Sequence, residues 1–303
     1  MAQNAAHAGG RQNRKLNHIT AGDIIIATLV TLLCFSMLYP FVNIVFQSLS
    51  TNAAITASNG MMLWPSEVTF DNYRYVFTYP NVWNAYKNTL FITFVGTALS
   101  LVLTTMGAYA LSKRDLPGRT FMTVVIIITM WVGGGLIPGY LNLRRLGLIN
   151  TRWVMIIPGC ISTGNLLLMR NFFLAQPLEL KESAYIDGAS ELRTLLNIVL
   201  PLSMAIMATM ALFYGVGYWN AYSGAILYNN RVENYPIQVV IHRMYSMAVV
   251  KNMDPEWLAT HTQIASDAVR AATVVFGTLP IMCVYPFLQK YFAKGVMVGS
   301  LKG

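Results

Sequence analysis

The sequence predicts an all-α, polytopic membrane protein with six transmembrane helices. Hydrophobic residues make up 55% of the 303 residues and charged residues only 11%, against roughly 25% charged residues in an ordinary soluble domain. The mean hydropathy is +0.49, and long charge-free stretches recur at a length that suits a bilayer. Lipid must therefore be the solvent for much of the chain. A soluble enzyme, an isolated binding module and a disordered chain are excluded.

A helix needs about 20 residues to cross the hydrocarbon core of a membrane. The predicted spans run over about 24–46, 88–111, 120–141, 153–173, 201–223 and 270–289. The fourth charge-free stretch is short, and the fifth is so long that its first residues are assigned to a loop before Pro201. The first run exceeds a signal-peptide core and lacks a clear small-residue cleavage site, so it is interpreted as an uncleaved anchor. The predicted organisation is a tail (1–20), a transmembrane domain (21–292) and a second tail (293–303).

The distribution of Lys and Arg predicts that both tails lie in the cytoplasm, since cytoplasmic loops are enriched in these residues. They occur in the first tail, the second-to-third loop and the last tail: Arg11, Arg14, Lys15, Lys113, Arg114, Arg119, Lys290, Lys294 and Lys302. The third-to-fourth loop opposes this majority with Arg144, Arg145 and Arg152. Membrane-flanking cations account for the net charge of +9, so the expected partner is the lipid bilayer of the cell membrane and not nucleic acid.

The positions of the cysteines and histidines do not predict a metal site or redox chemistry. Each of the three cysteines, Cys34, Cys160 and Cys283, lies inside an apolar run, which argues against a disulfide framework and a zinc site. The four histidines show no metal-ligand spacing. No cofactor is predicted.

The segment between the fourth and fifth spans, residues 176–201, holds four of the twelve acidic residues of the chain. Pro177 suits the first turn of a helix, Asp187-Gly188 suits a helix end, and Ser190 can cap a second helix. The second helix has an apolar face at i, i+3, i+4 and i+7, formed by Leu192, Leu195, Leu196 and Val199. The pattern predicts two short helices joined by a glycine corner. Such a hairpin fits a groove on a partner protein, or equally well lies on lipid.

Three motifs add a family resemblance. Glu182-x-Ala184, Gly188 and, after nine residues, Ile198-x-Leu200-Pro201 resemble the EAA loop of binding-protein-dependent ABC importer permeases, with Ser183 in place of the usual first Ala. The C-terminal run 285–292, with Lys294-Gly295 and 301–303, resembles the tail of carbohydrate permeases related to the second membrane subunit of the maltose importer. Residues 217–220, Gly-Tyr-Trp-Asn, are similar to their Trp-Asn signature. Within that family the chain is most similar to permeases for oligosaccharides or polysaccharide fragments.

The resemblance implies an ABC type I importer permease fold and a coupling role for the EAA loop. Carried over, Glu182, Ala184, Asp187 and Gly188 form the corner that docks into a cytoplasmic ATPase. Ile198, Leu200 and Pro201 hold that corner to the fifth span. The implied partners are a second homologous permease, an ABC ATPase dimer, an extracytoplasmic solute-binding protein and a carbohydrate substrate, and the implied mechanism is alternating access. The alternative is a loop that merely closes a pair of spans.

The chain is expected to be a transport subunit without enzyme activity of its own. A P-loop requires a Gly-Lys pair to hold phosphates, and none occurs in the sequence. The nearly charge-free spans weigh against the alternative function, an ion-coupled secondary transporter of a small polar solute.

The substrate path is predicted from fewer residues. Trp219 is able to stack on a sugar ring and Asn220 to bond its hydroxyls, or the pair is an interface anchor with a helix-end amide. Residues 133–135, all glycine, and Pro138 interrupt the third span, which suits either a cavity lining or close helix packing. The outer segment 227–270 is expected to face the binding protein and to hold a short helix after Pro255.

Overall fold

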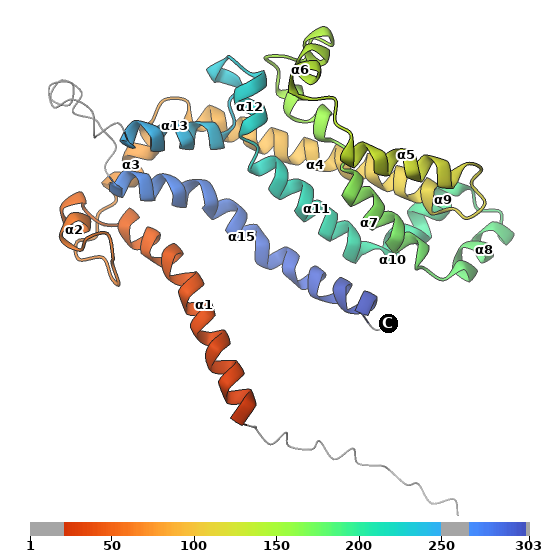
Figure 1. Ribbon diagram of the computed structural model, residues 1–303, viewed down its shortest axis with the longest axis horizontal. Coiled ribbons are helices and arrows are strands. Elements are labelled where there is room, and N and C mark those ends of the chain that lie inside the picture. The colour runs from red at the N-terminus through yellow and green to blue at the C-terminus, as the bar shows by residue number, and fades with distance from the viewer. Residues whose placement is uncertain (1–20, 250–266, 301–303) are drawn as a thin grey trace, which may run out of the picture.

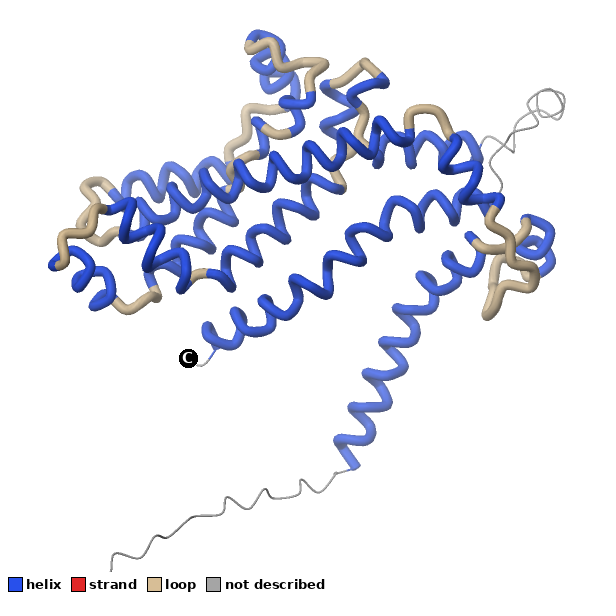
Figure 2. The backbone as a smooth tube through the Cα atoms, turned by 180° about the vertical axis from the view of Figure 1, so that it is seen from behind, coloured by secondary structure: helices blue, strands red, loops and turns tan. Residues whose placement is uncertain are grey.

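A computed structural model describes residues 21–249 and 267–300 of the chain. The described residues form helices and loops without a strand, apart from one isolated antiparallel bridge between Ser50 and Val68 (Figure 2). The helices are α1 (Ala21–Ser48), α2 (Asn52–Ala57), α3 (Asp71–Thr78), α4 (Val82–Ser112), α5 (Arg119–Trp131), α6 (Leu136–Arg145), α7 (Thr163–Leu174), α8 (Leu178–Ile186), α9 (Glu191–Thr194), α10 (Leu200–Leu202), α11 (Met204–Trp219), α12 (Ser223–Tyr228), α13 (Ile237–Val249) and α15 (Asp267–Ser300). Short 3₁₀ turns occur at Arg152–Met155, Ile157–Gly159 and Val232–Asn234, and Leu195–Val199 is π-helical.

Three helices in the described part of the chain are long and apolar enough to cross a membrane by themselves: α1, α4 and the first part of α15. Three bent pairs raise the number to six if each pair is one span. They are α5 with α6 at 112°, Arg152–Gly159 with α7 at 49°, and Glu191–Leu202 with α11 at 85°. Several helices extend beyond the apolar stretches, as α4 does by beginning at Val82 and α15 by continuing to Ser300. The predicted span limits remain predictions.

The core of the bundle lies between α4, α7 and α11, which run beside one another in Figure 1. Ile92, Met169, Phe173 and Met210 are fully buried there. Hydroxyl groups also join α4 to α11: the Thr104 and Tyr214 hydroxyls lie 2.7 Å apart, and those of Ser100 and Tyr218 3.0 Å apart. Because lipid tails are as apolar as the side chains, such interhelical hydrogen bonds and close packing hold membrane helices together.

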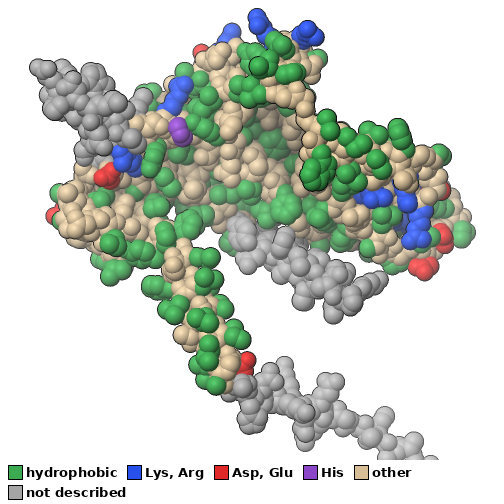
Figure 3. Space-filling model, viewed as in Figure 1, with side chains coloured by type: hydrophobic (Ala, Val, Ile, Leu, Met, Phe, Trp, Pro, Cys, Tyr) green, Lys and Arg blue, Asp and Glu red, His purple; other side chains and the backbone are tan. Residues whose placement is uncertain are grey.

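Helix α1 stands away from the bundle and meets α15 at one end (Figure 1). None of its most apolar stretch is buried within the chain, and hydrophobic side chains lie along most of its visible length (Figure 3). A helix that is apolar on every side needs lipid or another membrane helix around it. This arrangement agrees with the interpretation of the first run as a membrane anchor.

The third predicted span is broken where the sequence indicated. Helix α5 ends at Trp131, and α6 begins after Gly135, whose φ of +82° is left-handed.

Farther along, Asn150 holds the segment after α6 against the loop after α12. Its backbone N–H donates to the Tyr228 carbonyl at 3.0 Å, and its side-chain oxygen accepts from Asn230 N–H at 2.7 Å. The short helix predicted after Pro255 lies outside the described residues.

A candidate coupling site at one end of the bundle

Helix α8 and the turn that follows it form a glycine corner, as the sequence predicted. The helix begins directly after Pro177 and ends at Ile186, with Asp187 as its C-cap. Gly188 has a φ of +74°. Its N–H donates to the Tyr185 carbonyl at 3.0 Å, and the N–H of Ala189 donates to the Ala184 carbonyl at 2.9 Å. These two bonds form the Schellman motif, which satisfies the last carbonyls of a helix through a left-handed residue.

The second helix of the hairpin also begins where predicted, but its apolar residues divide. The Ser190 hydroxyl accepts a bond from the backbone N–H of Arg193 at 3.4 Å. Leu195 and Val199 are buried, whereas the Leu192 and Leu196 side chains are 64% and 51% exposed. A π-helical turn over Leu195–Val199 adds a residue to each turn. The α-helical spacing therefore overstated how many leucines pack on the chain itself.

The structure brings four predicted site residues together around one groove. Ala184, Asp187, Ile198 and Pro201 line a hollow of about 610 Å³, together with Arg193 and others. Within this set Ala184 is buried and Asp187 exposed. The groove thus lies between α8 and the segment leading into α11.

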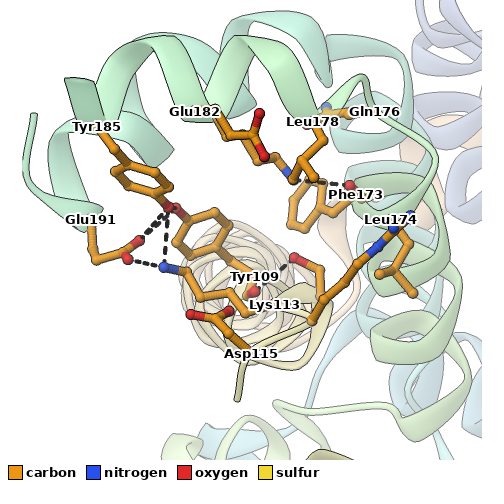
Figure 4. Close-up of a pocket in the computed structure, with 13 residues that line it drawn as sticks. Tyr109, Lys113, Asp115, Phe173, Leu174, Gln176, Leu178, Glu182, Tyr185 and Glu191 are labelled. Carbon is orange, nitrogen blue, oxygen red and sulfur yellow. Dashed lines mark hydrogen bonds and ion pairs between the residues drawn. The ribbon is translucent and has the colours of Figure 1, made fainter. Parts of the chain in front are cut away.

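The other three predicted residues lie elsewhere on the same loop. Gly188 occupies the exposed corner, and a Cβ atom at that position would meet nothing within 4 Å. Leu200 is half-buried against the bundle core. Glu182 lines a second cavity on the other side of α8 (Figure 4). The predicted residues therefore do not form one continuous site.

An exposed apolar residue at the corner escaped the sequence analysis. Ile186 is the last residue of α8, and its side chain is 86% exposed. The signal available in the sequence is its position directly before Asp187-Gly188, the predicted end of the helix. Its exposed side chain is available for a contact with another protein.

The second cavity, about 330 Å³, holds a polar cluster that the sequence analysis also missed (Figure 4). Tyr109 and Tyr185 both donate their hydroxyls to Glu191 Oε2, at 2.9 and 3.0 Å. Lys113 Nζ pairs with Glu191 Oε1 and donates to the Tyr185 hydroxyl at 3.1 Å. These four residues, called the latch below, join the end of α4 to α8 and α9.

Lys181 connects the same loop to α7. Its Nζ donates to the Phe173 carbonyl at 3.1 Å. Burial lowers the pKa of Lys181, and the nearby charges of Lys113 and Arg114 lower it further, while Tyr185 opposes them. Basic side chains are clustered at this end of the bundle (Figure 3).

The two residues predicted for the substrate path have different surroundings. Trp219 is buried, and its indole N–H donates to the Gly277 carbonyl at 3.1 Å. It lines an apolar hollow of about 460 Å³ between α4, α11 and α15. Asn220 is exposed just after α11, and its side-chain oxygen accepts from Gln238 at 3.4 Å. Their contact with a sugar stays a prediction.

Comparison with known proteins supplies the family. The family model described as "Binding-protein-dependent transport system inner membrane component" matches residues 24–298. The chain belongs to this family. The family inferred from the sequence motifs is therefore confirmed. Among the described residues, no group of three or more His, Cys, Asp or Glu side chains is placed to hold a metal ion.

Individual relatives of this permease cover nearly the whole chain. The polygalacturonan/rhamnogalacturonan transport system permease protein YtcP of Bacillus subtilis is 36% identical over 96% of this chain and 100% of its own length. Protein LplC of the same organism is 40% identical over 87% and 89%. A solved bacterial ABC transporter involved in the import of the acidic polysaccharide alginate matches with a TM-score of 0.80 and 33% identity, over 90% of this chain and 98% of that chain.

These findings establish a permease subunit of an ABC importer with the all-α type I permease fold. It is a transport subunit and not an enzyme. Membership implies a membrane location and work alongside an ATPase, a solute-binding protein and a second permease. The ion-coupled secondary transporter is not favoured.

Proposed function

We propose that this permease forms one half of the translocation path for an oligosaccharide, which a solute-binding protein delivers. In this proposal an ATPase dimer docks on residues 176–201, the coupling loop, and a second homologous permease forms the other half of the path. Both tails of the chain face the cytoplasm. The carbohydrate assignment is supported by the similar proteins, which include a polygalacturonan/rhamnogalacturonan permease and an alginate importer.

The observation that carries the coupling role is the shape and surface of the glycine corner. The Schellman bonds hold Gly188 at a fixed point between α8 and α9, and Ile186 points an 86% exposed side chain outward beside it. A hairpin lying on lipid would also expose Ile186. However, Glu182 and Asp187 are exposed on the same short helix, and burying such charges in lipid is costly. A protein cleft with polar partners suits this mixed surface better.

Each predicted residue then has a distinct task. Glu182 and Asp187 supply carboxylates for basic or N–H groups of the ATPase, while Ala184 and Gly188 keep the corner narrow enough for a cleft. Ile198, Leu200 and Pro201 join the corner to α11, because Leu200 packs on the bundle core and the other two line the groove beside α8.

The substrate path remains the less detailed part of the proposal. Asn220 is exposed and is the better placed of the two predicted residues to bond a sugar hydroxyl. The Trp219 indole N–H is already bonded to Gly277, so Trp219 would offer only a ring edge or face. Uptake of labelled neutral and uronate oligosaccharides by the reconstituted importer identifies the substrate class, and Asn220→Ala should weaken that uptake.

The coupling role is tested by purifying the permease from native membranes in detergent with three variants. Gly188→Pro disrupts the corner because proline cannot adopt a positive φ. Glu182→Lys reverses a charge that we assign to docking. Glu179→Lys is the matched control, since it makes the same charge reversal at another exposed position of α8.

The ATPase and the second permease should co-purify with the wild type and with Glu179→Lys. The Gly188→Pro and Glu182→Lys variants should retain the second permease and lose the ATPase. The proposal fails if the folded wild type is recovered alone, or if both corner variants hold the ATPase as tightly as the control does.

A further inference from the structure

Helix α4 connects the coupling loop to the far end of the molecule without interruption. It contains 31 residues and no proline, so at about 1.5 Å per residue it is roughly 46 Å long. By contrast, α1 and α15 each contain internal proline, and the other three candidate spans are bent pairs. Among the described spans, α4 is therefore the one best built to transmit a displacement along its axis.

Both ends of α4 are fixed to loops by side-chain hydrogen bonds. At its first end, Asn88 Nδ2 donates to the Glu233 and Tyr235 carbonyls at 2.6 and 3.1 Å, and the Thr89 hydroxyl accepts from Ile237 N–H at 2.7 Å. Asn88 and Thr89 are fully buried. At its last end, the latch residues Tyr109 and Lys113 hold the coupling loop.

The latch contains most of the polar connection between the corner and the rest of the described chain. From residues 178–194, the described side-chain bonds to other segments run to Tyr109 and Lys113 on α4 and to Phe173 at the end of α7. Lys113 also lies over the rings of Tyr109 and Tyr185, 5.5 and 5.3 Å from their centres. Glu191 receives bonds from three groups at once. These three bonds hold the Glu191 carboxylate in place, although its side chain is 56% exposed.

We propose that Lys113 and Glu191, with Tyr109 and Tyr185, are positioning residues that make α8, α9 and α4 move as one body. This inference rests on the proposed coupling function. Pro201 already connects the coupling loop to α11. The latch adds a second connection, which runs along α4 to the outer loop at 232–237. A change at the ATPase then reaches both ends of the translocation path together.

The first test measures transport per ATP hydrolysed by the reconstituted importer. Lys113→Met removes the ammonium group and keeps an unbranched apolar chain. Arg114→Gln is the matched control, because it removes a positive charge from the next residue, which has no hydrogen bond or ion pair among the described residues. The Lys113→Met complex should retain its ATPase and hydrolyse ATP. It should move at least about fivefold less substrate per ATP, the smallest effect of a typical allosteric coupling.

The charge-reversed pair provides a rescue. Lys113→Glu alone should uncouple transport, and Lys113→Glu combined with Glu191→Lys should restore much of the lost ratio. If the wild type, Lys113→Met and Arg114→Gln all transport the same amount of substrate per ATP, the inference is overturned and the docking role stays intact. Loss of the ATPase from the wild type complex would instead refute the proposed function itself.

A cross-link tests whether the two parts move together, independently of any loss of folding. Cysteines replace residues 113 and 191 in a chain whose Cys34, Cys160 and Cys283 are changed to serine, and a short reducible bis-thiol reagent joins them. Because both substitutions remove the latch, a single moving body predicts that the linker restores transport per ATP, which should fall again when the linker is reduced. Transport that is blocked by the linker and returns on reduction would show that the latch opens during the cycle, and the inference would be wrong.

Discussion

The conformation of Gly188 leads to a graded prediction for the coupling corner. Its φ of +74° lies in the left-handed region, which costs a residue with a Cβ atom roughly 1–2 kcal/mol. The added Cβ would meet no atom within 4 Å, so steric overlap adds nothing in the permease alone. Gly188→Ala should therefore weaken the corner by about 1–2 kcal/mol, which is roughly a 5- to 30-fold shift between the formed and frayed turn.

Two further variants separate backbone strain from the loss of glycine itself. Gly188→Asn should cost less than Gly188→Ala, because asparagine adopts a positive φ more readily. The chain itself uses asparagine in this way at Asn59, Asn81 and Asn150. Gly147→Ala is the matched control: Gly147 has a φ of +69° and equally open surroundings, but it follows α6, away from the coupling loop.

The assay combines the melting temperature of the detergent-solubilised permease with the amount of ATPase that co-purifies. Gly188→Ala and Gly147→Ala should lower the melting temperature alike, and only Gly188→Ala should reduce the bound ATPase. The amount of ATPase that co-purifies should decrease in the order wild type, Gly188→Asn, Gly188→Ala. If Gly147→Ala releases as much ATPase as Gly188→Ala, or if asparagine binds less than alanine, the argument from backbone strain is refuted.

Three other variants test separate features. Ile186→Asp should release the ATPase with little change in melting temperature, because the side chain is 86% exposed and packs little on its own chain; retention of the ATPase would contradict a docking contact. Gly96→Ala should destabilise the bundle by about 1–3 kcal/mol, since its Cβ would lie 2.7 Å from the Tyr218 ring, whereas Gly217→Ala, with open space around it, should not; thermal melts of the two compare them. Burial lowers the pKa of Lys181, so the folded protein loses the Lys181 proton at a lower pH than the unfolded chain does. The stability of the fold therefore rises with pH between the lowered pKa and the ordinary value of 10.5. Lys181→Met should remove that rise from melts recorded at increasing pH, and an unchanged slope would contradict it.

Local chemistry explains which parts of the coupling loop were predictable. A proline before α8, an Asp-Gly pair after it and a serine before α9 each act within a few residues, through fixed φ, left-handed backbone or a single capping bond. The structure confirms all three. The break of the third span at residues 133–135 was predictable for the same reason. Family membership, the all-α fold and the absence of an enzyme role also followed from the sequence motifs.

The latch was not predictable, because its partners are distant in sequence and belong to different helices. Tyr109 and Glu191 are 82 residues apart, and nothing in the pattern around either residue indicates the other. Lys113 was interpreted only as a cation near the membrane surface. The π-helical turn at Leu195–Val199 was equally hidden, since hydrophobic spacing assumes 3.6 residues per turn.

The surroundings of the corner differ between its inner and its outer side. The polar groups on its inner side are already paired, as Glu191 is with three partners on α4 and α8. On its outer side, Ile186 and Leu192 remain exposed, and the proposed orientation of the chain puts them on the cytoplasmic side. Such apolar groups gain free energy when a partner removes them from water. If an ATPase docks there as we propose, it meets a corner that is already joined to α4, and binding energy at the corner can be transmitted without first ordering the loop.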